Sequence, residues 1–145
     1  MLFRSSELLG VMTFGTPRFD KSFHYELLRL CWKPGIVVTG GSERLLSYFK
    51  ERFNPKSIVT YCNIAKFNGN SYTKLGFKLD SVSEPNYNWV QPIKNIVLPR
   101  YQTMKHKLIE RNLGTPDQTE SEIMESLGYL KIYDCGNLRF VWRRP

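Results

Sequence analysis

Two adjacent glycines lie directly before an amphipathic segment. Gly40-Gly41-Ser42 is followed by residues 45–53, where large apolar side chains recur at intervals of three and four residues. Backbone N–H groups at the start of a helix can bind a phosphate, so Gly40, Gly41 and Ser42 are candidate cofactor-binding residues. The same residues also suit a simple tight turn with Ser42 as the helix N-cap. Both interpretations remain open at this point.

Two further residues have side chains suited to proton transfer. Tyr72 carries a phenol, and Glu26, within an apolar segment, carries a carboxylate. Each also has a structural interpretation, with Tyr72 packing between elements and Glu26 pairing with Arg29. We name Tyr72 and Glu26 as the catalytic alternative and expect no catalytic residue otherwise.

Basic residues are the most abundant candidates for function. Lysines and arginines number 21 against 13 acids, a formal net charge of +8, which favours a polyanionic partner. Aromatic residues such as Tyr48 and Tyr101 are interleaved with them, which suits phosphate contacts with occasional base stacking. A merely solvated charged surface is the alternative. The candidate nucleic-acid-binding residues are Arg44, Lys50, Arg52, Lys56, Lys66, Lys74, Lys94, Arg100, Lys105, Lys107, Arg111, Arg139, Arg143 and Arg144.

Length and composition exclude several protein classes. A chain of 145 residues supports one main core, with at most a small appendage, and its ordinary hydrophobic and charged content excludes a fibrous or disordered protein. No apolar run approaches the ~20 residues of a membrane span. The interrupted N-terminal apolar stretch does not resemble a signal peptide, so we expect a cytoplasmic protein with no membrane partner.

The cysteines and histidines do not predict a metal site. Three cysteines without a Cys-x-x-Cys pair and two distant histidines support neither a disulfide framework nor zinc binding, so we expect no metal. The simplest interpretation of Cys31, Cys62 and Cys135 is that they are buried structural thiols.

The positioning elements in the first 90 residues follow from local patterns. Residues 8–15, 25–32, 56–62 and 77–82 are predicted strands, because they are apolar, β-branched or alternating and end at turn residues. The helix beginning near residue 42 should end at Asn54-Pro55, and the strand after it should run parallel to the strand before it. A short helix around Tyr72 should end at Gly76.

The remaining residues show a different pattern. Residues 91–111 carry prolines and several basic residues with Glu110 as the only acid, which predicts a basic connector with a helical turn or two near its end. Thr119-Glu120-Ser121-Glu122 predicts a capping box, and the helix should end at Gly128. Residues 129–133 and 138–142, joined by a turn, predict a β-hairpin.

The segment from Tyr25 to Phe77 resembles the core of the Gcn5-related N-acetyltransferase (GNAT) fold, especially its divergent phage branch. In that family a bulged strand leads into an Arg/Gln-x-x-Gly-x-Gly/Ala turn that binds acetyl-CoA, and here residues 37–42 match the glycine but have Val37 in place of the basic or amide residue. Tyr72 to Phe77 match the family's Tyr-x-x-Leu-Gly-Phe element. The resemblance implies Tyr72 as a general acid, and Glu26, on the strand that faces the cleft of this fold, as a general base. The resemblance implies acetyl-CoA as an alternative cofactor and an N-acyltransferase as an alternative function, although we expect no cofactor.

The C-terminal third is similar to the tails of phage homing endonucleases. The similarity rests on Pro85-Asn86-Tyr87, the basic residues 100–108, residues 119–124 and the run from Gly128 to Asn137. Those tails lie downstream of a nuclease domain and are expected to grip DNA, and no nuclease constellation is present here. The resemblance implies a DNA-binding part, with the connector and the C-terminal hairpin as two grips.

Together these observations predict an α+β fold with a truncated GNAT-like mixed sheet, flanking helices and a small C-terminal helix–hairpin unit. The expected boundaries are 1–90 for the core, 91–111 for the connector and 112–145 for the C-terminal unit. The expected function is phage-type, non-enzymatic nucleic-acid binding, with DNA favoured over RNA, in the cytoplasm of an infected host. A variant of this hypothesis is an anti-CRISPR-like inhibitor of a host defence nuclease or ribonucleoprotein complex.

Overall fold

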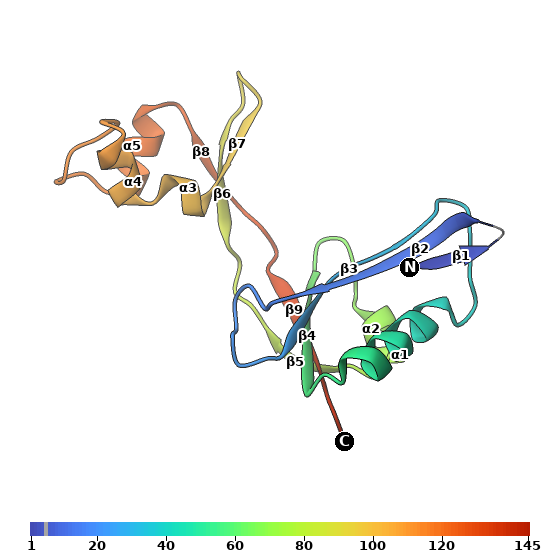
Figure 1. Cartoon of the computed structure of the whole chain (residues 1–145). Coiled ribbons are helices and arrows are strands. Elements are labelled where there is room, and N and C mark those ends of the chain that lie inside the picture. Colours follow the sequence, from blue (N-terminus) through green and yellow to red (C-terminus); the bar gives the residue numbers. More distant parts are fainter. Residues whose placement is uncertain (5) are drawn as a thin grey trace. The chain divides into compact units, whose positions relative to one another are not determined.

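The computed structural model describes residues 1–4 and 6–145 and shows an α+β chain in which helices flank a mixed and an antiparallel sheet (Figure 1). The chain forms two compact units. Unit 1 comprises residues 1–83 and 137–145, and unit 2 comprises residues 84–136, so unit 2 is an insertion in unit 1. Among the described residues, no helix is both long enough and apolar enough to span a membrane.

Unit 1 is built on a six-stranded mixed sheet in the order β1-β2-β3-β4-β9-β5. Its strands are β1 (Leu2–Arg4), β2 (Glu7–Gly15), β3 (Tyr25–Trp32), β4 (Ser57–Asn63), β5 (Lys78–Val82) and β9 (Asn137–Arg143). β3 and β4 are parallel, and the other neighbours are antiparallel. The four strands predicted in the first 90 residues and the parallel pair are therefore confirmed.

Two helices pack on one face of this sheet (Figure 1). They are α1 (Gly41–Phe53) and α2 (Asn70–Lys74). Leu46 and Phe49 of α1 join Leu27, Ile58 and Phe140 of the sheet in one buried cluster. The apolar interval of three and four residues predicted this buried face of α1, because such residues lie one above another on a helix.

The two ends of α1 differ in how well the sequence predicts them. Asn54 ends the helix in a left-handed conformation, and its N–H donates to the carbonyl of Lys50, as predicted from Asn54-Pro55. The predicted N-cap at Ser42 is wrong. Gly40, with φ 68°, is the N-cap and no side chain caps the helix, because the left-handed turn at Gly40 starts the helix earlier than Ser42.

β3 contains a bulge and separates from β4 soon after the strands meet. Phe14 pairs with Leu27 and Thr13 pairs with Arg29, so Leu28 is the extra residue of a bulge. The parallel ladder joins only Tyr25 with Ile58 and Glu26 with Val59.

Unit 2 contains a three-stranded antiparallel sheet and three short helices. The strands, in the order β7-β6-β8, and the helices are β6 (Tyr87–Gln91), β7 (Ile96–Pro99), β8 (Leu130–Tyr133), α3 (Arg100–Thr103), α4 (Lys105–Glu110) and α5 (Glu120–Ser126). Trp89, Leu108, Ile123 and Met124 form the core. The predicted capping box of α5 is confirmed, since Thr119 and Glu122 exchange hydrogen bonds.

The predicted C-terminal hairpin is wrong. β8 pairs with β6 in unit 2, whereas β9 pairs with β4 and β5 in unit 1. β9 buries Phe140 against the helix side of its sheet and Val141 against the other side, which requires a strand covered on both faces. The turn residues 134–136 therefore lead from one unit to the other.

The predicted boundaries near residues 90 and 111 also differ from the observed division. Residues 91–111 are not a connector, because β7 pairs with β6 and Leu108 of α4 lies in the core beside Trp89. A buried tryptophan needs apolar partners from several elements, and this segment supplies them in unit 2. The predicted helical turns near its end are present as α3 and α4.

The cysteines do not share one environment. Cys62 is buried in the core of unit 1, and burial raises the pKa of its thiol. Cys31 and Cys135 are exposed, so the prediction of buried thiols is wrong for both. Cys31 sits between Leu30 and Trp32, which both pack on the helix side of the sheet, so the alternation of a strand directs Cys31 away from that core.

Candidate nucleic-acid interface

The positive charge of the chain is concentrated in unit 1. Unit 1 has 15 lysines and arginines against six acids, which gives a net charge of +9, and unit 2 has six against seven, which gives −1. The acids of α5 and of the segments beside it offset the basic residues of 91–111. A polyanion is therefore attracted to unit 1 and not to unit 2 by net charge.

One face of the unit 1 sheet carries basic and aromatic side chains together. Residues 16–24, the loop between β2 and β3, pack on the sheet side opposite α1 and α2, where Phe23 is buried with Val59 and Val141. We call this surface, made of residues 16–24 and the outward side chains of β4, β5 and β9, the loop face. Phe19 contacts Tyr61 edge-on, with ring centroids 5.4 Å apart.

Glu26 anchors the loop from inside the loop face. Its carboxylate is 1% exposed. Oε2 accepts a hydrogen bond from the backbone N–H of Arg18 at 2.7 Å, and Oε1 accepts from Arg18 Nε at 2.9 Å and Nη2 at 2.6 Å. Both carboxylate oxygens are thus used by one arginine, and Glu26 holds the loop on the sheet.

A second ion-pair cluster ties the loop to β9 and β5. Arg139 donates to Asp80 at 2.7 Å and lies 3.4 Å from Asp20 of the loop. Hydrogen bonds from Ser22, together with the positive charges of Arg139 and Arg143, hold the pKa of Asp20 below its usual range. The hydrogen bond to Asp80 raises the pKa of Arg139. Arg139 is therefore a structural ion-pair partner between strand and loop.

Three other cations of the loop face have no carboxylate within ion-pair distance among residues 1–4 and 6–145. Arg143 lies over the ring of Phe23, 5.2 Å from its centroid. Lys78 pairs with Val141 across β5 and β9 and so points to the same side of the sheet. Lys21 donates to the carbonyl of Pro17 and remains exposed.

Arg144 has a capping role. Its guanidinium donates to the carbonyls of Asn54 and Pro55, the latter at 3.1 Å, just past the C-terminal end of α1. A cation at this end of a helix is favourable because it meets the negative end of the helix dipole. Arg139, Arg143 and Arg144 were expected to form a second grip on a hairpin. They lie instead on and after β9 of unit 1, where only Arg143 is without such a structural bond among the described residues.

The predicted basic residues of α1 and the loops after it are also in unit 1. Arg44 and Arg52 are exposed on α1, where Glu43 and Glu51 offset them. Lys50 lies 4.0 Å from the ring centroid of Trp142, and burial lowers the pKa of its amine. The predicted lysines that follow α1 in unit 1, Lys56, Lys66 and Lys74, are exposed.

Three of the predicted basic residues of unit 2 contact other groups of the same unit. Lys105 donates to Pro116 O and Lys107 donates to Tyr101 O, each at 2.6 Å. Arg100 lies over the ring of Tyr87, 5.1 Å from its centroid.

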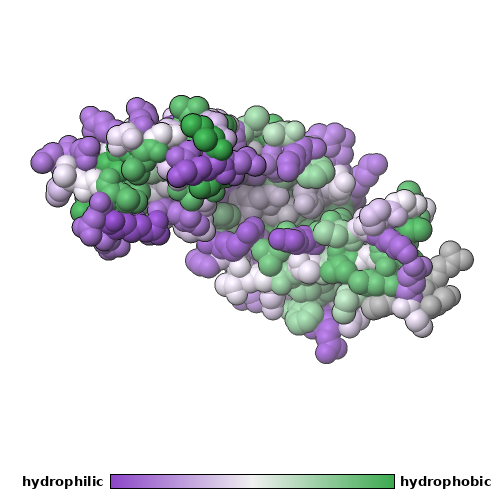
Figure 2. Space-filling view, turned by 90° about the horizontal axis from the view of Figure 1, so that it is seen from above, coloured by the Kyte–Doolittle hydropathy of each residue, from purple (hydrophilic) through white to green (hydrophobic). Residues whose placement is uncertain are grey.

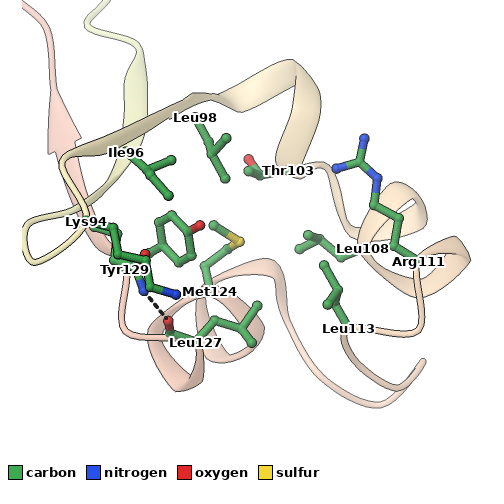
Figure 3. Close-up of a pocket in the computed structure, with 11 residues that line it drawn as sticks. Lys94, Ile96, Leu98, Thr103, Leu108, Arg111, Leu113, Met124, Leu127 and Tyr129 are labelled. Carbon is green, nitrogen blue, oxygen red and sulfur yellow. Dashed lines mark hydrogen bonds between the residues drawn. The ribbon is translucent and has the colours of Figure 1, made fainter.

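A pocket of about 260 Å³ lies in unit 2 beside its core (Figure 3). Its walls are mainly apolar, and Lys94 and Arg111 lie on different sides of it. Thr103 is the buried polar residue of the lining, and its hydroxyl donates to Arg100 O at 3.1 Å. No buried polar side chain among the described residues lacks a partner, so nothing in the lining indicates a ligand.

The glycine turn is shaped by packing. A Cβ on Gly41 would meet the indole of Trp32 at 2.4 Å, so this glycine is required by the close approach of Trp32. Val37, at the family's basic or amide position, is 94% exposed and offers no side-chain donor. Ser42 is half-buried in the first turn of α1, and Gly40 provides the left-handed turn before it.

The two catalytic candidates do not meet at a common site. Tyr72 is half-buried, with its ring 5.6 Å from Phe140 and 6.1 Å from Phe77. These rings belong to the core on the helix side of the sheet, whereas Glu26 is buried against Arg18 on the loop face.

The sequence analysis missed several functional residues of the loop face, namely Arg18, Phe19, Lys21, Tyr61 and Lys78. A signal was available in the run Arg18-Phe19-Asp20-Lys21, where an aromatic residue stands among charges in a turn segment. No family model and no curated protein matches this chain.

Proposed function

We propose that this protein is a non-enzymatic nucleic-acid-binding protein whose binding surface lies on unit 1. The observation that carries the proposal is the separation of charge, with +9 on unit 1 and −1 on unit 2. Phosphate contacts supply most of the sequence-independent affinity of such proteins, so the unit with the positive field is the one that binds. DNA is favoured over RNA as the partner.

The interface proposed here does not include residues 91–111, which were predicted to bind. Arg100, Lys105 and Lys107 donate to, or stack on, groups of unit 2 itself, and acids of the same unit offset their charge. On the loop face, Lys21, Lys78 and Arg143 have no carboxylate within ion-pair distance among the described residues, and Arg143 lies over the ring of Phe23.

A relationship to the GNAT fold and to phage homing endonucleases is part of the same proposal. The bulge in β3, the parallel β3–β4 pair and the glycine turn before α1 support the first relationship. A phage protein of this kind acts in the cytoplasm of its host, and blocking the nucleic-acid channel of a host defence nuclease is one use of such a surface.

Gel-shift titrations at two salt concentrations test the proposal. The loop-face variant carries Lys21→Gln, Lys78→Gln and Arg143→Gln, and the matched control carries Arg100→Gln, Lys105→Gln and Lys107→Gln. The loop-face variant should bind more weakly and should reduce the slope of log K against log salt by about 0.7–0.9 per lost phosphate contact. The control variant should bind like the natural chain.

Two results would overturn the proposal. Absence of binding at ~50 mM salt, where counterion release most favours it, would remove nucleic acid as the partner. A control variant that loses more affinity than the loop-face variant would return the interface to unit 2. Melting temperatures of both variants show that the comparison is between folded proteins.

The second candidate function is an acetyl-CoA-dependent acyltransferase. One observation favours it, namely that α1 begins at a left-handed glycine with no side-chain cap, next to parallel strands that stop pairing after two residues. Against it, Arg18 occupies the carboxylate of Glu26 and Val37 supplies no donor. Calorimetry with acetyl-CoA should detect no low-micromolar binding, and acyl transfer that is lost in Tyr72→Phe would favour the enzyme instead.

A further inference from the structure

Phe19 is an exposed aromatic side chain in a well-anchored loop. Large hydrophobic residues occur among hydrophilic ones on the surface shown in Figure 2. Phe19 is 74% exposed although it lies beside a buried cluster. Its guanidinium neighbour Arg18 lies 5.5 Å from the ring centroid, and Tyr61 supports the ring edge-on. Most of the ring surface is therefore open to a ligand.

The loop is fixed on both sides of Phe19. Before it, three hydrogen bonds join Arg18 to buried Glu26. After it, Asp20 accepts hydrogen bonds from Ser22 and pairs with Arg139, and Phe23 is buried against the sheet. An aromatic group held in one position loses little conformational entropy on binding, which favours stacking.

Three cations lie on the loop face together with Phe19. Arg143 and Lys78 extend from β9 and β5, and Lys21 lies two residues beyond Phe19 in the loop. The carboxylates that face this surface are Asp20, Glu26 and Asp80, and each is bonded to an arginine. A ring with open surface, on the same face of the sheet as cations that are not paired with these acids, suits a base next to its backbone phosphates.

We infer that the loop face binds single-stranded nucleic acid, with an unpaired base stacked on Phe19 and the flanking phosphates contacted by Lys21, Lys78 and Arg143. The inference rests on the proposed function and specifies its substrate class. Duplex nucleic acid keeps its bases stacked on one another, so it can meet the cations of this surface but not the open ring of Phe19.

Phe67 provides a matched control for Phe19. It is 67% exposed in the segment between β4 and α2, also in unit 1. Among the described residues no aromatic ring or cation is stacked on it. Phe19→Ala and Phe67→Ala remove the same exposed group, so a difference between them reports the position of the ring.

The experiment is fluorescence anisotropy of the full chain with three labelled probes, namely a thymidine oligonucleotide, an abasic oligonucleotide of the same length and a DNA hairpin duplex. Phe19→Ala should weaken binding of the thymidine strand by about 5- to 150-fold, the range for loss of one stacked base. It should leave the salt slope unchanged, because no charge is removed. Binding of the abasic strand and of the duplex should stay the same, and Phe19→Trp should retain the thymidine affinity.

The outcomes separate this inference from the proposed function. If the natural chain binds none of the probes, both fail. If it binds the probes but Phe19→Ala leaves thymidine affinity unchanged, or Phe67→Ala lowers it equally, the stacking inference alone is overturned. Equal weakening of the thymidine and abasic strands would also overturn it, because an abasic strand has no base to stack.

Discussion

Substituting Arg18 or Glu26 should destabilise the protein by different amounts, although the two residues form one ion pair. Arg18→Ala removes two of the three hydrogen bonds to Glu26 and leaves a carboxylate that is 1% exposed with one backbone donor. Glu26→Gln instead keeps an amide oxygen that can accept from the guanidinium, and the Arg18 side chain is 60% exposed, so water can replace the remaining lost bonds. Removing the arginine should therefore cost more than neutralising the acid.

The expected losses in the free energy of unfolding follow from the number and kind of hydrogen bonds removed. Hydrogen bonds to charged groups contribute about 1.5–3 kcal/mol, and an uncompensated buried charge costs about 3–5 kcal/mol. Because a backbone donor remains on Glu26, we expect a loss of about 3 kcal/mol for Arg18→Ala and about 1–2 kcal/mol for Glu26→Gln. At about 4–8 °C per kcal/mol in a domain of roughly 60–100 residues, the first loss lowers Tm by more than ~10 °C.

Urea unfolding measures both losses, and hydrogen exchange of β3 amides assigns them to unit 1. Lys33→Ala is the control, because it breaks an exposed pair with Glu7 and should cost less than ~1 kcal/mol. A Glu26→Gln loss equal to or larger than that of Arg18→Ala would refute the anchoring role of this pair. A loss below ~0.5 kcal/mol for Arg18→Ala would refute it as well.

Three further predictions concern other sites. Gly41→Ala should lower stability by about 1–3 kcal/mol in thermal unfolding, because its Cβ would overlap Trp32. Glu120→Ala should destabilise unit 2 by about 1–3 kcal/mol in urea, because buried Trp89 Nε1 loses its acceptor at 2.9 Å. Capping-box hydrogen bonds hold the pKa of Glu122 below its ordinary value. The stabilisation they give is therefore complete above pH ~4.3 and is lost as pH falls through the folded-state pKa. Circular dichroism should show this loss, and Glu122→Gln should abolish the pH dependence.

The sequence was sufficient for elements that local patterns determine. The apolar periodicity of α1, the β-branched and aromatic residues of β4 and the capping box of α5 each lie within a few consecutive residues. Asn54 could be assigned for the same reason, since its conformation depends on its immediate neighbours. Such features are encoded by side-chain spacing and turn chemistry alone.

Pairings between distant residues could not be predicted in this way. β5 and β9 are neighbours although Ser83 and Asn137 are 54 positions apart in the chain, and no local pattern distinguishes this from a β8–β9 hairpin. The turn Asp134 to Asn137 has hairpin chemistry, but its two flanking strands find better burial in different sheets. The turn residues alone therefore predicted the wrong partner for the last strand.

The position of the basic surface could not be predicted from the sequence either. Counting along the chain placed the grip at residues 91–111, where five basic residues occur with one acid. Folding brings the acids of residues 117–134 into the same unit, and it brings Lys78 beside Arg143 on the loop face. Net charge per folded unit is a three-dimensional quantity, so the location of the basic surface became visible only with the strand order.

The insertion of unit 2 leads to a last prediction. The chain leaves β5 and returns to β9 at adjacent points, because Val82 pairs with Leu138 and Ser83 N–H donates to Asn137 O at 2.8 Å. A two-residue Asn-Gly turn can close antiparallel strands at such a point, so it can replace residues 84–136. The shortened chain should fold, keep the net charge of +9 and bind nucleic acid with the salt slope of the full chain. Circular dichroism and gel shifts test this: a shortened chain that does not fold would refute the independence of unit 1, and a folded one that does not bind would refute the placement of the interface.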